Sequence, residues 1–252
     1  MNEPHAEFRL SEAQVNQFWN DGYLEVTNVI DPDEVERMRT AMAAIVERGI
    51  GHESWTDDVD TGDGEKTLRE RALIRDIHRL SPVIGNSTYR RVAESIAAQI
   101  LGEGMFFSSS YGFYKPPRVG VSIPWHQGCG FFPMGSSAEL LSFWMPFQEV
   151  NEANGCLYYI PGSHRGGMLP HYNYNQDPEL PNLIVIEPGY VQREQDQRPC
   201  IMGPGSMVFH NSRAVHRSSP NLSPHPRYAT ILDFVHPTWY DGHQIPEPVS
   251  QA

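Results

Sequence analysis

The sequence is poor in cysteine, in basic residues and in long apolar runs, and each shortage excludes a class of protein. The three cysteines (Cys129, Cys156 and Cys200) are odd in number and lack CxxC spacing, which argues against a disulfide framework and a thiolate zinc site. No apolar run approaches the ~20 residues of a membrane span, so we expect a soluble protein that does not bind membranes. The net charge of -12 disfavours a nucleic-acid polymer as partner, because such binding needs a basic face.

The opening residues bear on where the protein works. They read MNEPHAEFRL, which is polar and unlike a secretory leader, and we therefore expect a reducing, cytoplasmic compartment. A length of 252 residues fits one large domain, since β-sandwiches and barrels reach this size undivided. We predict a single domain over residues 1–252, with a mainly helical part at 1–104 and a β core at 105–240.

Helix signals dominate the N-terminal part. One helix is predicted to begin after Ser11 and to end at Gly22, and a second to begin after Asp31, because Ser and Asp are strong N-caps and Gly is a common C-terminal stop. A third helix is predicted near residues 87–101. The segment 51–67, GHESWTDDVDTGDGEKT, is rich in Gly, Asp and Thr and predicts a long mobile loop, either a lid or disordered chain.

Later in the chain the sequence changes to short aromatic and β-branched runs that Gly and Pro interrupt. About eight such runs without long helices between them favour an antiparallel sandwich or barrel. We therefore predict a mainly β fold, a jelly roll flanked by N-terminal helices. The clearest runs are MFFSSSYGFYK, VGVSIPWHQ, ELLSFWMPFQEV, CLYYIPG, NLIVIE, GSMVFH and RYATILDFVH.

The stretch PWHQGCGFF raises the question of a metal site. A His-x-Asp pair on a strand, followed much later by a second His, marks the facial iron(II) triad, but here Gly128 stands where the carboxylate belongs. His126 and His216 lie at or just past predicted strand ends, where the mouth of a barrel would gather ligands. His210 competes with His216, or is instead a core or outer-shell histidine. Either the pattern is accidental, or the metal has one protein ligand fewer than usual.

Three ordered segments carry a family resemblance. HQGCGFFPMGSSAELLSFW, ANGCLYYIPGSHRGGMLPH and GSMVFHNSRAVHRSSPN, with Arg227, resemble the phytanoyl-CoA hydroxylase family of iron(II)/2-oxoglutarate oxygenases. The likeness extends to FWNDGYLEVTNVIDPDEVERMR and so covers most of the chain. It implies a double-stranded β-helix, a cupin-like jelly roll, with iron(II) on His126 and His216. It further implies that Arg227 holds the distal carboxylate of 2-oxoglutarate with help from Ser218, and that Trp144 lines the cosubstrate pocket.

Gly128 departs from this family, whose oxygenases have Asp at that position. The departure resembles the non-haem iron halogenases, which carry Gly or Ala there and accept a chloride in place of the carboxylate. Gly leaves room for the halide, and chloride preserves the formal charge that the carboxylate would supply. The resemblance implies Fe(II), 2-oxoglutarate, chloride and O2 as cofactors, and chlorination of an unactivated sp3 carbon of a small molecule in secondary metabolism.

Three alternatives stay open. The first is an iron(II)/2-oxoglutarate-dependent hydroxylase, either with a native two-histidine site or with an Asp that was replaced for study. The second is a catalytically dead binding domain, against which stand the retained His126, His216 and Arg227. The third is a zinc enzyme, which would need a third protein ligand such as His210 or Cys129.

The substrate is harder to infer. Phe131 and Phe132 are candidates for apolar or stacking walls, and Arg118, His171 and Arg193 for contacts with an anionic group around the mouth. Stacking together with phosphate contacts makes a nucleotide, of the kind chlorinated in antibiotic pathways, the first substrate hypothesis. A free amino acid or a carrier-tethered acyl group stays open, and the sequence does not indicate the oligomeric state.

Overall fold

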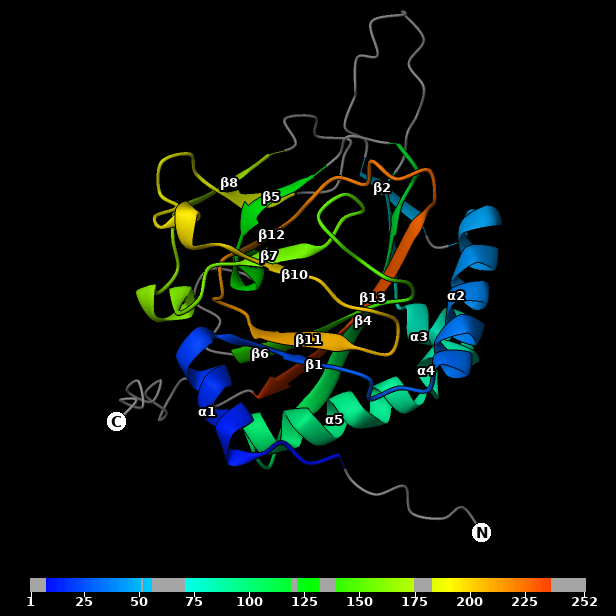
Figure 1. Cartoon of the computed structure of the whole chain (residues 1–252), viewed down its shortest axis with the longest axis horizontal. Coiled ribbons are helices and arrows are strands. Elements are labelled where there is room, and N and C mark those ends of the chain that lie inside the picture. The colour runs from blue at the N-terminus through cyan, green and yellow to red at the C-terminus, as the bar shows by residue number, and fades with distance from the viewer. Residues whose placement is uncertain are drawn as a thin grey trace, which may run out of the picture.

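Two antiparallel sheets face each other, and helices cover the larger one (Figure 1). The computed structural model describes residues 8–50, 52–55, 71–118, 122–131, 139–174 and 183–236. The large sheet has seven strands, in the order β1 (Tyr23–Val26), β11 (Met207–Asn211), β6 (Glu139–Pro146), β13 (Arg227–His236), β4 (Phe106–Lys115), β3 (Arg71–Arg75) and β2 (His52–Trp55). The small sheet has four, in the order β10 (Arg198–Cys200), β7 (Leu157–Tyr159), β12 (His216–Ser218) and β5 (Ile123–His126). A separate pair joins β8 (His171–Asn173) and β9 (Ile184–Ile186).

Local sequence signals set the helix ends. The Ser11 hydroxyl accepts from the Gln14 N–H while the Gln14 side chain accepts from the Ser11 N–H, which is a capping box, and the helix ends at Gly22 with a φ of 82°. The three helices predicted from the sequence are confirmed. The helices of the described chain are α1 (Glu12–Asp21), α2 (Pro32–Glu47), α3 (Ile77–Leu80), α4 (Pro82–Gly85) and α5 (Thr88–Leu101), with 3-10 turns η1 (Gly128–Phe131), η2 (Ser163–Gly166) and η3 (Glu194–Asp196).

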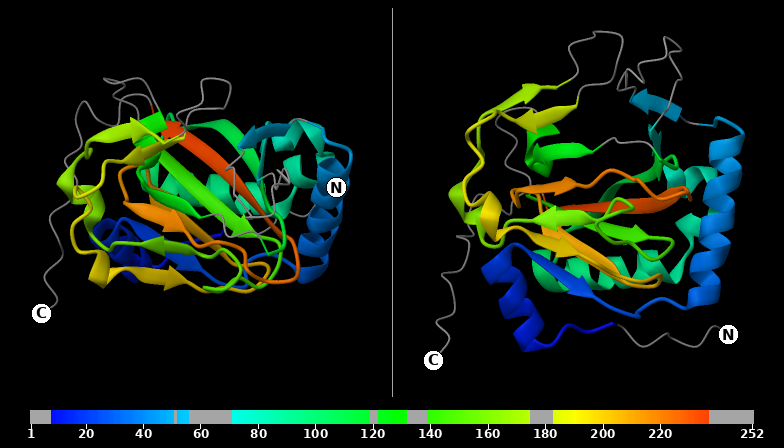
Figure 2. Two further views of the ribbon diagram at one scale, coloured as in Figure 1. Left: turned by 90° about the horizontal axis from the view of Figure 1, so that it is seen from above. Right: turned by 45° about the horizontal axis from the view of Figure 1, so that its top comes forward.

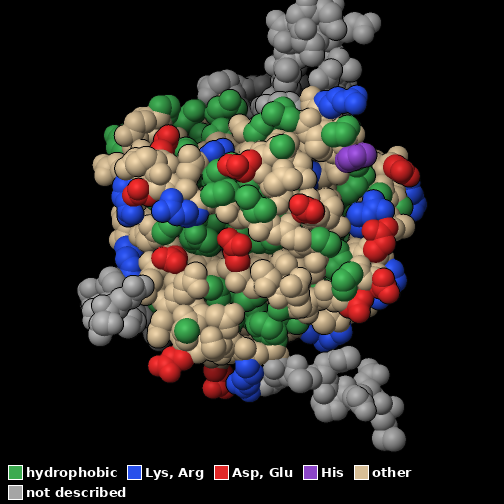
Figure 3. Space-filling view, viewed as in Figure 1, with side chains coloured by type: hydrophobic (Ala, Val, Ile, Leu, Met, Phe, Trp, Pro, Cys, Tyr) green, Lys and Arg blue, Asp and Glu red, His purple; other side chains and the backbone are tan. Residues whose placement is uncertain are grey.

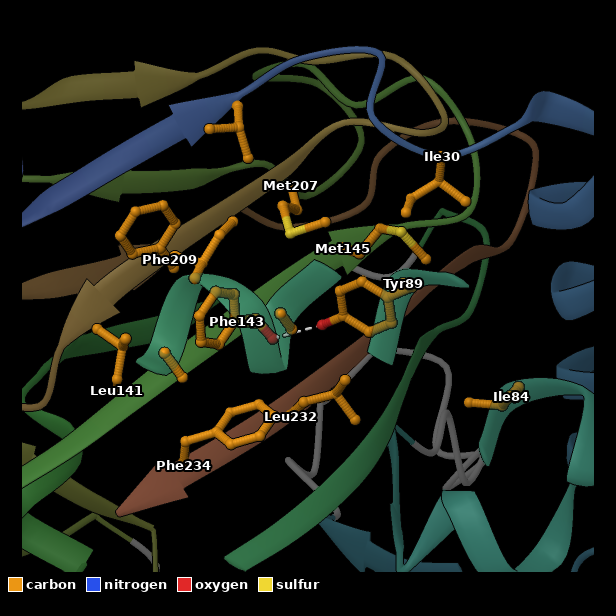
Figure 4. Close-up of a cluster of buried hydrophobic side chains, with 14 of the residues drawn as sticks. Ile30, Ile84, Tyr89, Leu141, Phe143, Met145, Met207, Phe209, Leu232 and Phe234 are labelled. Carbon is orange, nitrogen blue, oxygen red and sulfur yellow. Dashed lines mark hydrogen bonds between the residues drawn. The ribbon is translucent and has the colours of Figure 1, made fainter. Parts of the chain in front are cut away.

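The main apolar core lies between the helices and the outer face of the large sheet. The rings of Phe143 and Phe209, from neighbouring strands, stack with centroids 5.2 Å apart, and Phe234 packs edge-on against Phe143. From α5, the buried Tyr89 hydroxyl donates to the Phe143 carbonyl at 2.7 Å (Figure 4). Burial of such rings supplies most of the stabilisation between the layers, because large apolar area leaves water there.

The two sheets form separate layers (Figure 2), and a second apolar core lies between them. Trp144 and Val208 come from the large sheet and Leu157 and Tyr159 from the small one. The Tyr159 ring stacks on Tyr23 at 4.3 Å and 10°, so the sheets are joined by an aromatic contact. The predicted mainly β fold with N-terminal helices is confirmed. Within the described residues, no helix has the length and apolar character to cross a bilayer.

The structure also contains strands that the sequence did not predict. The N-terminal part contributes β1, β2 and β3 to the large sheet, and His216 opens its own strand β12 instead of trailing behind the preceding one. The loop predicted for 51–67 contains β2, and all of its other residues lie outside the described part. β2 forms because β3 offers backbone partners from a distant segment, which local composition does not reveal.

Candidate metal and cosubstrate site

Two imidazoles meet on the inner face of the small sheet. His126 is the last residue of β5 and His216 the first of β12, and the two are register partners across an antiparallel pair. Their ring centroids lie 4.1 Å apart with an interplanar angle of 51°. The strand pairing therefore brings together the two histidines that the sequence singled out, although 90 positions separate them in the chain.

The backbone fixes which nitrogen of each ring carries the proton. Nδ1 of His126 lies 2.9 Å from the carbonyl oxygen of Pro124, and Nδ1 of His216 lies 2.9 Å from that of Ala214. A carbonyl oxygen only accepts, so both Nδ1 atoms are donors and both Nε2 atoms keep a lone pair. This is the arrangement found behind metal-binding histidines, whose second nitrogen is usually held by a carbonyl or carboxylate.

Burial keeps these rings neutral. It lowers the pKa of His126 well below its ordinary value, with His216 adding to the effect, and it lowers the pKa of His216 to about 3, with His210 adding to it. Neutral imidazole is the form that binds a metal ion. The pair is thus ready to donate two nitrogens near neutral pH without first losing protons.

Gly128 is the first residue of the 3-10 turn η1 and follows His126 by two positions. A Cβ built on Gly128 would meet nothing closer than the Ser212 carbonyl oxygen at 3.5 Å, with Leu140 Cδ2 at 3.8 Å, so the space beside it is free of close contacts. Over the residues that the structure describes, no three or more His, Cys, Asp or Glu side chains are arranged to hold a metal ion. A third protein ligand of the kind a zinc enzyme needs is therefore missing from that part of the chain.

His210 supports the pair from the opposite sheet. It lies on β11, its ring centroid is 4.4 Å from that of His216, and its Nδ1 is 2.9 Å from the Tyr159 hydroxyl. Tyr159 also stacks against His216 at 5.5 Å. His216 is held between these two side chains, and a supporting role for His210 behind it stays a prediction.

Arg227, which the family resemblance places at the cosubstrate, is a buried cation at the start of β13. It is only 3% exposed, and its Nε and Nη1 atoms have no hydrogen-bond partner. Burial lowers its pKa to about 9, because the charged guanidinium has left water. Unpaired buried guanidinium nitrogens are costly, and a carboxylate that accepts from both would remove that penalty.

Lys115 is the site residue that sequence reasoning missed. Its Nζ donates to Ser218 Oγ at 2.8 Å and to the Ser219 carbonyl, and the side chain is buried. A Cβ on Gly155 would lie 3.1 Å from Arg227 Nε and 3.3 Å from Lys115 Cδ, so both cations pack on this glycine. The sequence did hold a signal for it. Tyr111, Phe113 and Lys115 alternate along β4, so the lysine lies on the same inward face as the two aromatic rings.

The remaining predicted residues are placed as follows. Trp144 is buried on the inner face, and the centre of its ring lies 5.9 Å from the guanidinium carbon of Arg227. Phe131 is 42% exposed and meets His126 edge-on at 6.0 Å. Arg118 and Arg193 are exposed, and Arg193 pairs with Asp196 at 2.7 Å, which uses its charge locally. Phe132 lies outside the described residues.

His171 is the predicted substrate residue whose ring has a buried nitrogen without a hydrogen-bond partner. Its Nδ1 lies 2.5 Å from the Leu169 carbonyl oxygen, so Nδ1 is again the donor, and its Nε2 is buried without a partner. The ring packs on Gly130, where a Cβ would lie 3.1 Å from Nε2. Burial lowers the pKa of His171, and a neutral ring of this tautomer accepts a hydrogen bond through Nε2.

The donor set fits an iron(II) ion with 2-oxoglutarate. Two Nε2 lone pairs suit iron(II), and the orphaned guanidinium nitrogens of Arg227 need an anion such as a carboxylate. A jelly roll with these features defines an iron(II)/2-oxoglutarate-dependent oxygenase. The chain belongs to the phytanoyl-CoA dioxygenase (PhyH) family, which matches it over residues 18–229. The family resemblance inferred from the sequence is therefore confirmed.

Individual relatives agree with this assignment. The chain is 29% identical to the ectoine dioxygenase of Bordetella parapertussis, over 96% of this chain and 82% of that protein. It is 24% identical to a probable alpha-ketoglutarate-dependent hypophosphite dioxygenase of Stutzerimonas stutzeri, over 83% and 73% of the two chains. EvdO2 of Micromonospora carbonacea var. aurantiaca, solved with 2-oxoglutarate, shares the fold with a TM-score of 0.75 at 24% identity, over 92% of this chain and 93% of that one.

Proposed function

We propose that this chain is an iron(II)/2-oxoglutarate-dependent halogenase, which chlorinates an sp3 carbon of a small molecule. The observation that carries the proposal is Gly128: the position that follows His126 by two residues has no carboxylate, and the space around its Cβ position is open to 3.5 Å. A halide in that space would restore the charge that a carboxylate supplies. Bound iron(II) with 2-oxoglutarate and dioxygen supplies an oxidant strong enough to remove hydrogen from an aliphatic carbon.

The protein's own residues divide the work. His126 and His216 offer their Nε2 lone pairs, and the carbonyls behind them hold the rings in place. Arg227, beside Lys115, receives the distal carboxylate of the cosubstrate in a buried setting where water does not compete. Selectivity between halide and hydroxyl transfer then depends on where the protein holds the substrate carbon.

His171 and Phe131 are the substrate contacts we propose. His171 presents an unpaired Nε2, so it takes an O–H or N–H donor from the substrate rather than an anion. Phe131 offers an exposed ring beside His126 for an apolar or aromatic group. A nucleotide, with amino and hydroxyl donors next to an aromatic base, is the substrate class to test first.

A hydroxylase with a two-histidine site is the second candidate function. The observation that favours it is that the named relatives are dioxygenases, among them the ectoine and hypophosphite enzymes. Both candidates need the same imidazoles and the same arginine. They differ in whether the position beside Gly128 takes a halide, and the test must address that difference directly.

The test needs no knowledge of the substrate. Without oxygen, the protein loaded with iron(II) and 2-oxoglutarate is titrated with sodium chloride while its visible charge-transfer band is followed, with sodium sulfate as ionic-strength control. We expect a saturable shift with chloride alone in the wild type. Gly128→Asp should keep the band and lose the shift, because its carboxylate takes the halide's place.

Product analysis completes the test. With a nucleotide panel and ectoine as substrates, mass spectrometry should find chlorine in the wild-type product when chloride is present. A wild type that binds iron(II) and 2-oxoglutarate, ignores chloride and gives only hydroxylated product supports the hydroxylase and overturns the halogenase. Binding of both ligands without any consumption of 2-oxoglutarate over the panel would favour the binding domain.

A further inference from the structure

Gln127, the middle residue of the HQG motif, is fully buried and outside the site described so far. Its Nε2 donates to the Gly167 carbonyl at 2.9 Å and to the Arg213 carbonyl at 2.7 Å, and its Oε1 accepts from the Leu169 N–H at 2.8 Å. One side-chain amide therefore ties the end of β5 to two other segments. One of these segments leads into β8 and the other into β12.

Each segment also carries the carbonyl that orients the next imidazole. Ala214, which follows the bonded carbonyl directly, accepts the Nδ1 proton of His216 at 2.9 Å. Leu169 accepts the Nδ1 proton of His171 at 2.5 Å. A displacement of either segment would move the acceptor and turn the ring behind it, because the acceptor fixes the ring's tautomer and plane.

The backbone around Gln127 is held at the same place. The Cys129 N–H donates to the Ser212 carbonyl at 3.0 Å, and the Gly130 N–H donates to the Gln127 carbonyl at 2.9 Å. The turn that contains Gly128 is thus attached to the segment that precedes His216. Strand pairing between β5 and β12 alone leaves a register shift after His216, so this attachment supplies a second constraint.

We propose that Gln127 is a positioning residue, which sets the mutual orientation of His126, His216 and His171 through the segments it bonds. The inference rests on the proposed metal site at the first two histidines. An amide suits the task because it supplies two donors and an acceptor at one point, and neither carboxylate nor thioether can replace it. Outer-shell partners of metal-binding histidines typically contribute 10- to 100-fold to metal affinity.

The chain provides a matched control in Gln99. Its Nε2 donates to the Phe8 and Ser95 carbonyls at 2.8 and 2.9 Å, and its Oε1 accepts from the Leu10 N–H at 3.0 Å. It makes the same three kinds of backbone bond as Gln127, on the far side of the large sheet and half-buried. Gln99→Met and Gln127→Met therefore remove equal sets of bonds, and only one set lies behind the imidazoles.

The experiment measures iron(II) binding without oxygen for the wild type and both Met variants. We expect Gln99→Met to bind like the wild type and Gln127→Met to bind roughly 10- to 100-fold more weakly. Nitrogen NMR of the metal-free proteins gives an independent readout. The Nδ1–H form of His216 and His171 should be the single form in the wild type and in Gln99→Met, and should mix with the other tautomer in Gln127→Met.

Each outcome decides between the inference and the proposed function. A wild type that binds no iron(II) overturns the metal site itself. A wild type that binds it, with Gln127→Met equal in affinity and tautomers, overturns the positioning role alone. If Gln127→Met does not fold, Gln127→Glu serves in its place, since it keeps the acceptor for Leu169 and loses both donated bonds.

Discussion

Lys115 and Arg227 are register partners on β4 and β13, and both pack on Gly155. Arg227 is buried and its Nε and Nη1 atoms have no hydrogen-bond partner, so a bound anion that accepts from them would remove the cost of burying this cation. A dicarboxylate cosubstrate is such an anion. Ser218 accepts from Lys115 Nζ at 2.8 Å, and its predicted part in holding the cosubstrate beside Arg227 stays a prediction.

The first prediction concerns Arg227. Arg227→Ala should weaken 2-oxoglutarate binding by roughly 2–5 kcal/mol, which is a loss of about 30-fold or more, because the variant leaves a buried carboxylate without its forked donor. Calorimetric titration without oxygen measures this. Arg227→Lys should recover only part of the affinity, since an ammonium cannot make the two parallel bonds. Unchanged affinity in Arg227→Ala would remove the residue from the cosubstrate site.

The second prediction separates His216 from His210. His216→Ala should lose iron(II) affinity by roughly 100-fold, as a ligand is worth at least what an outer-shell partner is worth. His210→Gln should still bind one equivalent, because the His210 ring only supports His216 from the opposite sheet. Metal analysis after equilibrium dialysis gives both numbers. The reverse pattern would exchange the two assignments.

The third prediction compares neighbouring glycines. Gly130→Ala should destabilise the protein by about 1–3 kcal/mol, because its Cβ would lie 2.9 Å from His171 Cδ2 and 3.3 Å from Ile184 Cγ2. Gly128→Ala should fold like the wild type, since its Cβ meets nothing closer than 3.5 Å. Urea unfolding of both variants provides the comparison. Equal destabilisation would mean that the space beside Gly128 is not open.

The fourth prediction concerns pH and Asp233. This buried carboxyl accepts from Ser109 at 2.8 Å and from Ser142 at 2.7 Å, and burial raises its pKa from 3.8 to about 6. The folded state thus holds the proton more tightly than the unfolded one. The resulting stabilisation is complete below the unfolded pKa and is lost as the pH rises through 6.

Asp233→Asn removes this dependence. The free energy of unfolding of the variant relative to the wild type should rise by roughly 2.5 kcal/mol from about pH 4 to about pH 7.5, at 1.36 kcal/mol per pKa unit. Urea titrations of both proteins across that range measure the difference. A constant difference would show that Asp233 titrates normally in the folded protein.

Local signals explain which parts of the fold were predictable. Ser11 and Gly22 mark helix ends through bonds within a few residues, so the sequence states them directly. β2 and β12 depend on partners far along the chain, and a three-residue strand such as β12 has no periodicity to detect. Sequence patterns therefore predict elements that residues near in the chain determine, and miss strands that depend on pairing with a distant segment.

The same distinction applies to the site. His126, His216 and Arg227 belong to family motifs, so the sequence singled them out, and the structure brings the two histidines together. Lys115 was missed because its place in the site follows from its contacts with Ser218 and Gly155, which are distant in the sequence. Arg118 and Arg193 were expected around the mouth from the family resemblance; both are exposed, and their contact with an anionic group stays a prediction. On the face shown in Figure 3, such basic side chains are interspersed with acidic ones.

The imidazole pair belongs to the four-stranded sheet, whereas Lys115 and Arg227 belong to the seven-stranded one. A cosubstrate bound by both groups, as proposed, would therefore link two sheets that otherwise contact each other mainly through side chains. By mass action, a ligand at 100 times its Kd adds about 2.7 kcal/mol to the folded state. The small sheet could then separate from the large one only if the cosubstrate dissociates. A protease that cleaves the opened form should therefore cut the ligand-bound protein more slowly than the free protein.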